Sequence, residues 1–208
     1  SDKIPKIIFP AIALIVSGGH TILLLMSDLS HWKKLGETRD DAVGEAYDKV
    51  ARMMGLPYPG GPILEKLAKR GNGEAIKFPR PMLNQKNYDF SFSGLKTSVF
   101  YYLRDRKNEN KADVAASFEA AMLEVLEKKT KRAAELFGVR SIMLSGGVAA
   151  NKNLRKRLGG VARKLKIPLL VSPKKFNTDN ATMIGVASYF GFNKKSKKGI
   201  EARAHLNI

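Results

Sequence analysis

Short unbroken apolar runs alternate along the chain with longer stretches in which apolar residues recur at helical spacing. The runs at 12–16, 22–26, 141–144 and 169–172 are typical of buried strands. Apolar stripes predict helices over 112–137 and 153–165, and a last apolar segment predicts a helix that runs to Phe192. The pattern therefore predicts a protein built from both strands and helices.

Two of the predicted strands end in the same short signal, Ser-Gly-Gly. Residues 17–19 are followed by a second apolar run, as in a hairpin, whereas residues 145–147 lead to Asn151 and a basic helix. Paired glycines let backbone N–H groups approach an anion or a nucleobase without a Cβ in the way. The first turn suits a phosphate and the second a base or ribose; two ordinary tight turns are the alternative interpretation.

Five acidic residues cluster between positions 37 and 48. In a helix, Asp41, Glu45 and Asp48 would share one face, because they are spaced i, i+4 and i+7. Like charges at that spacing repel each other. This face is therefore either solvated or turned toward a cleft that holds ribose hydroxyls or a cation. Asp48 is the strongest candidate for such a contact with ribose hydroxyls or a cation. Glu65 lies one turn into the helix that follows the next Pro/Gly turn, where its carboxylate can accept from sugar hydroxyls.

Two aromatic residues alternate with small polar ones ahead of another helix. In an extended segment this alternation places Phe90 and Phe92 on one side, and we assign both rings to the core. Ser91, Ser93 and Lys96 then face the other way, where they could meet a phosphate.

Composition narrows the classes of protein to consider. The 208 residues, 44% of them hydrophobic, suffice for one or two small globular domains. The absence of cysteine excludes disulfides and thiolate metal sites. No run of about 18 uncharged apolar residues predicts a transmembrane helix, and the first residues do not resemble a signal peptide. We therefore expect a cytoplasmic protein with no membrane partner.

The sequence carries a large excess of positive charge. The 37 Lys and Arg residues against 19 Asp and Glu residues give a net charge of +18, and no acid occurs between positions 151 and 175. Each phosphate that a cation neutralises releases counterions, so contact with nucleic acid is the economical interpretation. A solvated lysine-rich surface is the alternative. The candidate nucleic-acid contacts are Lys152, Arg155, Lys156, Arg157, Arg163 and Lys164.

Several catalytic motifs are missing from the sequence. The three histidines form neither an HExxH nor an HxxxH pair, so a zincin-type site is not expected. No Gly-x-Ser-x-Gly elbow surrounds Ser17 or Ser145, and no P-loop occurs. A hydrolase triad and a P-loop NTPase are therefore disfavoured.

Longer motifs resemble one protein family over nearly the whole chain. They are SGGHT at 17–21, LGETRDDAVGEAYDKVARMMGLPYPGGPILEKLA at 35–68, FPRP at 78–81, DFSFSGLKT at 89–97, ASFEA at 116–120, SGGVAANKNLR at 145–155 and TDNATMI at 178–184. Together they resemble the TsaD (Gcp, YgjD) family of tRNA N6-adenosine threonylcarbamoyltransferases. The resemblance implies an α/β fold of the actin-like, Hsp70-like and sugar-kinase-like (ASKHA) class, with a helical insertion over roughly 36–135 of this chain.

The resemblance also implies an activity and a set of site residues. The reaction transfers a threonylcarbamoyl group from threonylcarbamoyl-AMP to N6 of adenine 37 in tRNAs that read ANN codons, and ATP is the other nucleotide expected to bind. The family's substrate-binding positions match Ile15, Val16, Ser17, Gly18, Gly19, Asp48, Gly61, Glu65 and Asn151, the last near Gly146 and Gly147. Its ligand for iron, or another divalent metal, matches Asp179.

The chain departs from the family pattern at its start. Family members carry an N-terminal lobe ahead of the SGGHT motif, with a His-x-x-x-His pair that completes the metal site. We therefore expect residues 1–208 to be the C-terminal lobe alone, with the first lobe either cut away or on another chain. Because one carboxylate holds a transition metal poorly, we expect this chain by itself to bind metal weakly and to be inactive.

A second hypothesis is a non-catalytic, nucleotide-binding scaffold of the same modification complex. The two hypotheses differ in whether tRNA is modified when the N-terminal lobe is supplied. In either case the resemblance implies TsaB-like and TsaE-like partners, with a TsaC-like enzyme making the adenylate.

Overall fold

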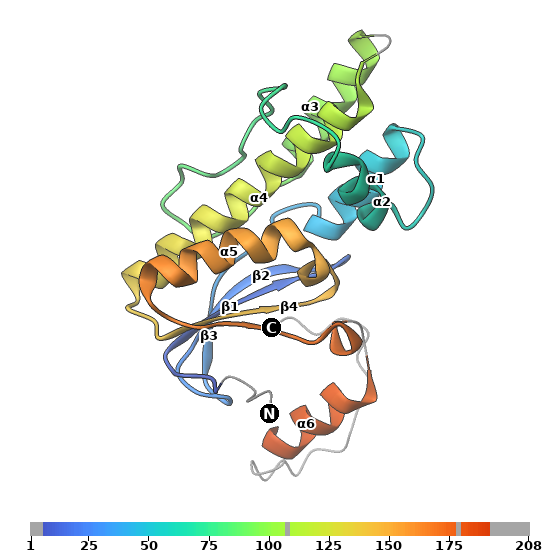
Figure 1. The fold of residues 1–208 in the computed structure, drawn as a ribbon. Helices are drawn as coiled ribbons and strands as arrows, with labels where there is room; N and C mark the ends of the chain where they lie inside the picture. Colours follow the sequence, from blue (N-terminus) through green and yellow to red (C-terminus); the bar gives the residue numbers. More distant parts are fainter. Residues whose placement is uncertain (1–5, 107–108, 178–179, 192–208) are drawn as a thin grey trace.

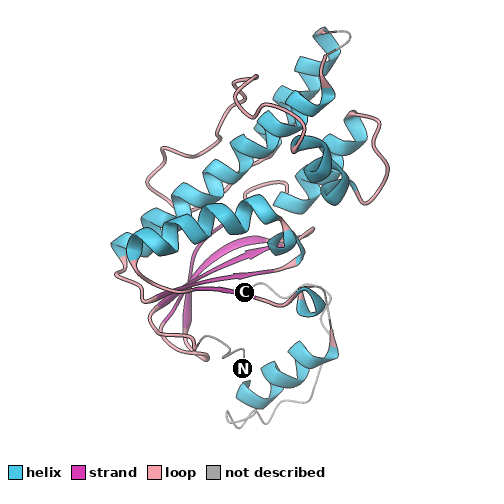
Figure 2. Cartoon of the chain, viewed as in Figure 1, coloured by secondary structure: helices cyan, strands magenta, loops and turns pink. Residues whose placement is uncertain are grey.

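The computed structural model describes residues 6–106, 109–177 and 180–191, in which α4 and α5 cover one face of a mixed sheet (Figures 1 and 2). The strands are β1 (Ala11–Val16), β2 (Thr21–Met26), β3 (Trp32–Glu37), β4 (Ser141–Ser145) and β5 (Leu169–Val171). The helices are α1 (Val43–Met53), α2 (Gly60–Ala68), α3 (Ser93–Asp105), α4 (Lys111–Leu136), α5 (Lys152–Leu165) and α6 (Ala181–Gly191), with 3-10 turns η1 (Gly147–Ala150) and η2 (Lys174–Phe176). The strands and long helices predicted from the apolar pattern are confirmed, while Phe192 lies outside the described residues.

The sheet has the strand order β3-β2-β1-β4-β5. The hairpin β1–β2 is antiparallel, as predicted, whereas β1 and β4 run parallel, with Ile15 opposite Ser145. Since parallel strands end at the same edge of a sheet, the two Ser-Gly-Gly turns lie side by side despite their distance in sequence. Within the described ranges, no helix has the length and apolar character needed to cross a membrane.

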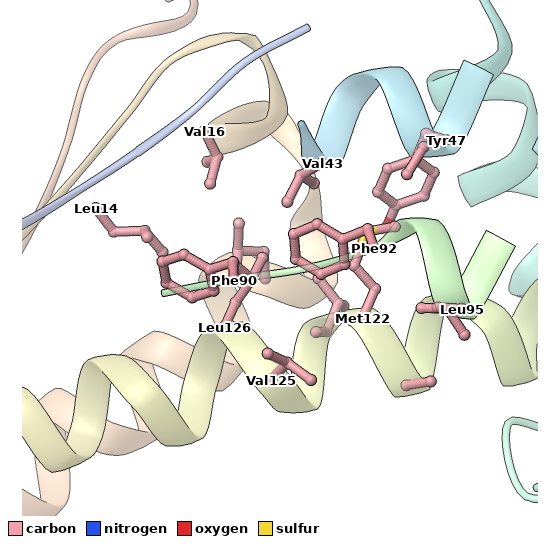
Figure 3. Close-up of a cluster of buried hydrophobic side chains, with 14 of the residues drawn as sticks. Leu14, Val16, Val43, Tyr47, Phe90, Phe92, Leu95, Met122, Val125 and Leu126 are labelled. Atoms are coloured by element: carbon pink, nitrogen blue, oxygen red, sulfur yellow. The ribbon is translucent and has the colours of Figure 1, made fainter. Parts of the chain in front are cut away.

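The main core lies between the sheet and α4 and encloses the extended segment that precedes α3 (Figure 3). Phe90 and Phe92 have no exposed surface and lie nearly parallel, with ring centroids 6.4 Å apart. Leu14 of β1 and Met122 and Leu126 of α4 are buried around them. Each buried side chain of this kind contributes about 1.5–3 kcal/mol to folding. The assignment of both rings to the core is confirmed.

The polar residues of the same segment are bound by carboxylates of the chain itself. Asp40 Oδ1 accepts hydrogen bonds from the N–H groups of Phe92 (2.8 Å) and Ser93 (3.2 Å) and so caps α3. Ser91 Oγ donates to Asp40 Oδ2, and the Lys96 ammonium lies 2.6 Å from Asp41 Oδ2. The expectation of an open phosphate site is therefore wrong for Ser91 and Lys96, whose side chains bind Asp40 and Asp41, whereas Ser93 is bound only through its backbone N–H.

Most of the acidic cluster is neutralised within the chain. Helix α1 begins at Val43, so Asp41 precedes it, and Lys49 Nζ lies 2.7 Å from Asp41 and 2.8 Å from Glu45. Burial tends to raise the pKa of Asp41, but hydrogen bonds from Lys49 and Lys96 outweigh burial and hold this pKa below its ordinary value. The hypothesis of one acidic face toward a cleft is thus wrong for Asp41 and Glu45, which are paired with lysines, while Asp48 lines a cavity.

A buried lysine fastens the loop before Tyr88 to α4. Lys129 is 1% exposed, donates to the carbonyl of Asn87 at 3.1 Å, and lies 5.9 Å from the centroid of the Phe90 ring. Arg132 donates to the Gln85 carbonyl at 2.8 Å. Burial, together with the nearby Arg132 charge, lowers the pKa of Lys129 to about 8.

This buried lysine predicts a rise in stability with pH. Between pH 8 and 9.5 the unfolded chain holds the Lys129 proton more firmly than the folded chain, so the free energy of unfolding should increase by about 1 kcal/mol. Lys129→Met should remove this rise, whereas Lys128→Met, at an exposed position on the same helix, should keep it. Urea unfolding followed by circular dichroism at pH 7.5, 8.5 and 9.5 measures the effect. Parallel pH profiles for wild type and Lys129→Met would contradict it.

Candidate functional site

A cavity of about 420 Å³ lies where β1 and β4 end. Four separate parts of the chain line it: the first Ser-Gly-Gly turn, α1, the start of α2 and the segment from the second turn to α5. Of the residues predicted to bind substrate, it brings together Gly18, Asp48, Gly61, Glu65, Gly147 and Asn151.

The first Ser-Gly-Gly turn presents two open backbone amides. Ser17 N donates to the His20 carbonyl at 2.8 Å, and Ser17 Oγ accepts from His20 N at 3.0 Å. The N–H groups of Gly18 and Gly19 donate to no group of the described chain. A Cβ at either glycine would have no atom within 4 Å. Such exposed amides can bind an anion.

The second turn touches the end of β1. Gly146 has a φ of +91°, and a Cβ there would lie 2.2 Å from the Val16 carbonyl oxygen. Only glycine tolerates both the left-handed backbone and this approach. Ile15 and Val16, the last residues of β1, were also predicted to bind substrate, but their side chains point away from the cavity. Val16 is in the main core, and Ile15 packs with the small apolar cluster on the other face of the sheet.

Asp48 holds the start of α2 while lining the cavity. Its Oδ1 accepts hydrogen bonds from the N–H groups of Gly60 (2.8 Å) and Gly61 (3.2 Å), so it caps this helix from outside. Its Oδ2 has no hydrogen bond to the described chain. Asp48 therefore has one carboxylate oxygen for the fold and one available to a ligand.

Glu65 joins α2 to the start of α5. Its Oε1 accepts from the backbone N–H of Lys152 at 3.3 Å and lies 3.4 Å from the Lys69 ammonium. With its side chain 16% exposed, Glu65 is fixed in position at the cavity wall.

Behind the cavity lies a buried carboxylate that the sequence analysis did not single out. Glu119 is 4% exposed; its Oε1 accepts from Asn151 Nδ2 (2.8 Å) and the Tyr47 hydroxyl (3.1 Å), and its Oε2 accepts from Asn153 Nδ2 (2.7 Å). Asn151 Oδ1 meanwhile accepts from Leu154 N at 2.8 Å and caps α5. Burial and the nearby Glu119 raise the pKa of Tyr47 well above its ordinary value, so this hydroxyl stays a donor.

Tyr58 is a second residue that the sequence analysis missed. It lines the cavity, yet 82% of its surface is exposed, and prolines on both sides restrict its backbone. A large aromatic ring held in solvent at a cavity rim is suited to stacking on a flat ligand. The only signal in the sequence is the aromatic residue between two prolines.

The basic side chains of α5 are of two kinds, those exposed to solvent and those bound by other groups of the chain. Of the predicted nucleic-acid contacts, Lys152, Lys156, Arg163 and Lys164 are exposed on α5. Arg155 Nε instead donates to the Ala149 carbonyl, and Arg157 Nη1 lies 2.7 Å from Glu127 Oε2. Two of the six cations are therefore oriented by groups of the chain itself.

The predicted metal ligand Asp179 lies outside the described residues. Across 6–106, 109–177 and 180–191, no three His, Asp or Glu side chains come close enough to hold a metal ion. These residues alone do not provide a transition-metal site.

Comparison with known sequences gives one consistent result. A family model described as TsaD, tRNA N6-adenosine threonylcarbamoyltransferase, matches residues 2–186. Proteins with that name from Moorella thermoacetica and Thermosipho africanus are 51% and 50% identical to the chain over 195 and 199 residues. These matches cover 92% and 95% of the chain, but only 57% and 59% of the relatives. The chain thus spans less than two thirds of their length.

Solved structures share the fold. The HypF protein of T. kodakarensis has a TM-score of 0.57 at 24% identity, over 74% of the chain and 20% of HypF. A full-length HypF has a TM-score of 0.61 at 13% identity, over 79% of the chain and 30% of that protein. The likeness concerns the fold alone, and it confirms the expected α/β, actin-like class.

Proposed function

Because the chain belongs to the TsaD family of tRNA N6-adenosine threonylcarbamoyltransferases, we propose that it supplies most of the nucleotide-binding half of such an enzyme. The enzyme would move a threonylcarbamoyl group from threonylcarbamoyl-AMP to N6 of adenine 37 in tRNAs that read ANN codons. One observation carries the proposal: six residues matched to the family's substrate and nucleotide positions line a single cavity.

Each part of an adenylate has a suitable group in this cavity. The open amide of Gly18, which lines the cavity, and that of the adjacent Gly19 suit the phosphate, because backbone N–H groups bind anions well. Asp48 Oδ2 and the Glu65 carboxylate suit the ribose hydroxyls as acceptors. The exposed Tyr58 ring suits stacking on the adenine base.

In the proposed reaction, N6 of the tRNA adenine attacks the carbamoyl carbonyl carbon. The new C–N bond forms as the bond from that carbon to the phosphate oxygen breaks, N6 loses a proton, and AMP leaves with its phosphate. Amides fixed around the phosphate would stabilise the negative charge that grows on it. The protein's part in this step is to orient the adenylate and hold the leaving group.

Further components of the proposal come from the family resemblance. They are a divalent metal, with iron preferred, at Asp179, and TsaB-like, TsaE-like and TsaC-like partner proteins. Since the described residues do not complete a metal site, no step above depends on a metal. The tRNA substrate and the lack of cysteine support a cytoplasmic location.

Calorimetric titration of the chain with ATP and with a threonylcarbamoyl-adenylate analogue tests the nucleotide site. We expect micromolar binding by wild type and about tenfold weaker binding by Asp48→Asn and by Tyr58→Ala. Asparagine keeps the oxygen that caps α2 and removes only the second acceptor, so it is a cleaner change than alanine. Transfer of labelled threonylcarbamoyl to tRNA, with the N-terminal lobe of a relative added, tests catalysis directly.

Two controls make the titration specific. Tyr58→Phe keeps the ring and should bind like wild type. Tyr101→Ala removes a tyrosine that is 48% exposed on α3, away from the cavity, and should also bind normally. Wild-type affinity in both Asp48→Asn and Tyr58→Ala would show that the nucleotide binds elsewhere, and a folded wild type that binds neither ligand would refute the nucleotide-binding role of this chain.

A further inference from the structure

A second cavity, of about 470 Å³, lies between α4 and α5, which run along the same face of the sheet (Figure 1). We name it the α4–α5 groove; its charged lining consists of Glu119, Glu127, Lys131, Lys156, Arg157 and Lys164. Glu119 stands between the two cavities, since its Oε1 bonds Tyr47 and Asn151 of the first and its Oε2 bonds Asn153, which lines the groove. The hydrogen bonds of one carboxylate therefore connect the linings of the two cavities.

The charges of the groove leave a positive excess. Glu119 is bound by three neutral donors, and Glu127 is paired with Arg157 at 2.7 Å. Lys131 is paired with Glu135 at 3.1 Å. Lys156 and Lys164 are exposed and form no ion pair with the described part of the chain. Two ammonium groups are thus available to an anionic ligand.

The spacing of these lysines leaves room for an extended ligand. Lys156, Gly160 and Lys164 follow one another at four-residue intervals and share one face of α5, so the outer two are about 12 Å apart along the axis. No atom lies within 4 Å of a Cβ built at Gly160. Glycine weakens a helix interior relative to alanine, and here it keeps the space between the two lysines open.

We propose that the α4–α5 groove binds the sugar–phosphate backbone of tRNA, with Lys156 and Lys164 each neutralising a phosphate. This inference rests on the proposed function, which makes tRNA the substrate. The same helix connects the two sites, because α5 is capped by Asn151 at the first cavity and then continues along the groove. A strand held in the groove would lie beside the nucleotide site.

The first test removes the two available charges. Lys156→Ala/Lys164→Ala should bind an unmodified tRNA transcript at least tenfold more weakly, and the slope of log Kd against log salt should fall by about one per lysine. Lys33→Ala/Lys86→Ala removes the same charge at exposed positions outside the groove and should keep both the affinity and the slope. Filter binding over a range of KCl concentrations measures both quantities.

The second test fills the groove without changing charge. Gly160→Leu should extend into the open space and weaken tRNA binding about tenfold, as expected for losing phosphate contacts. Gly159→Ala, the neighbouring position on α5 outside the groove lining, should bind like wild type. Both changes raise helix propensity, so both proteins should fold, and ATP titration should show an unchanged nucleotide site.

The outcomes separate the groove from the proposed function. If wild type binds tRNA and Gly160→Leu binds it equally well, the groove is not the binding site, although tRNA remains the substrate. If wild type binds no tRNA, the proposed function itself fails. If the Lys156→Ala/Lys164→Ala protein keeps both the affinity of wild type for tRNA and its salt dependence, these lysines do not contact phosphates and the proposal is overturned.

Discussion

Gly146→Ala is expected to lower the free energy of unfolding by about 3 kcal/mol or more and to abolish nucleotide binding. The new Cβ would lie 2.2 Å from the carbonyl oxygen and 2.7 Å from the carbonyl carbon of Val16. Val16 cannot yield, because β1 is paired on one side with β2 and on the other with β4. The positive φ of +91° adds strain for any residue with a side chain.

The adjacent glycine gives a matched control. A Cβ at Gly147 would have no atom within 4 Å, so Gly147→Ala should change stability little. Guanidinium unfolding compares the two variants, and ATP calorimetry follows the site. A Gly146→Ala protein as stable as wild type would mean that β1 and the second turn are not in contact, and the shared cavity would lose its basis.

Glu119→Ala should be the second most damaging change, lowering the free energy of unfolding by about 3 kcal/mol. It leaves the buried donors of Tyr47, Asn151 and Asn153 without their acceptor. Asn151 both caps α5 and lines the nucleotide cavity, so its displacement should also remove ATP binding. Thermal unfolding and calorimetry measure the two effects.

Glu119→Gln distinguishes the hydrogen bonds from the negative charge. Glutamine keeps one oxygen that accepts from Asn151 and Tyr47. Its amide nitrogen can donate to Asn153 if the Asn153 side-chain amide flips by 180° and presents its oxygen. We therefore expect this variant to retain stability and ATP binding. Equal losses in Glu119→Gln and Glu119→Ala would show instead that the charge itself is needed.

Particular residues show which features of the fold the local sequence pattern can predict. Phe90 and Phe92 could be assigned to the core because alternation in an extended segment fixes which side each residue faces. The Ser-Gly-Gly turns could be recognised because paired glycines have few uses other than turns and close approaches. Asp41 was misjudged because its partners, Lys49 and Lys96, lie in two different elements.

The candidate site also contains residues that the local sequence predicts and residues that it does not. Asp48, Gly61 and Glu65 follow one another along a short, distinctive segment, so matching a family motif was enough to select them. Glu119 lies within an apolar stripe of α4, 72 residues from Tyr47 and 32 from Asn151. No local pattern joins residues that far apart, because their proximity depends on how α4 and α5 pack together.

The sequence by itself determined every described strand except β3, the long helices, the family and the positive charge, because periodicity, motifs and composition are properties of the chain read in order. Only the tertiary structure decided that the two Ser-Gly-Gly turns meet at one cavity, since this requires β1 and β4 to pair in parallel register. It also separated the cations of α5 that the chain itself binds from those left exposed. The physical reason is that ion pairs and burial depend on distances in space, which packing between remote segments sets.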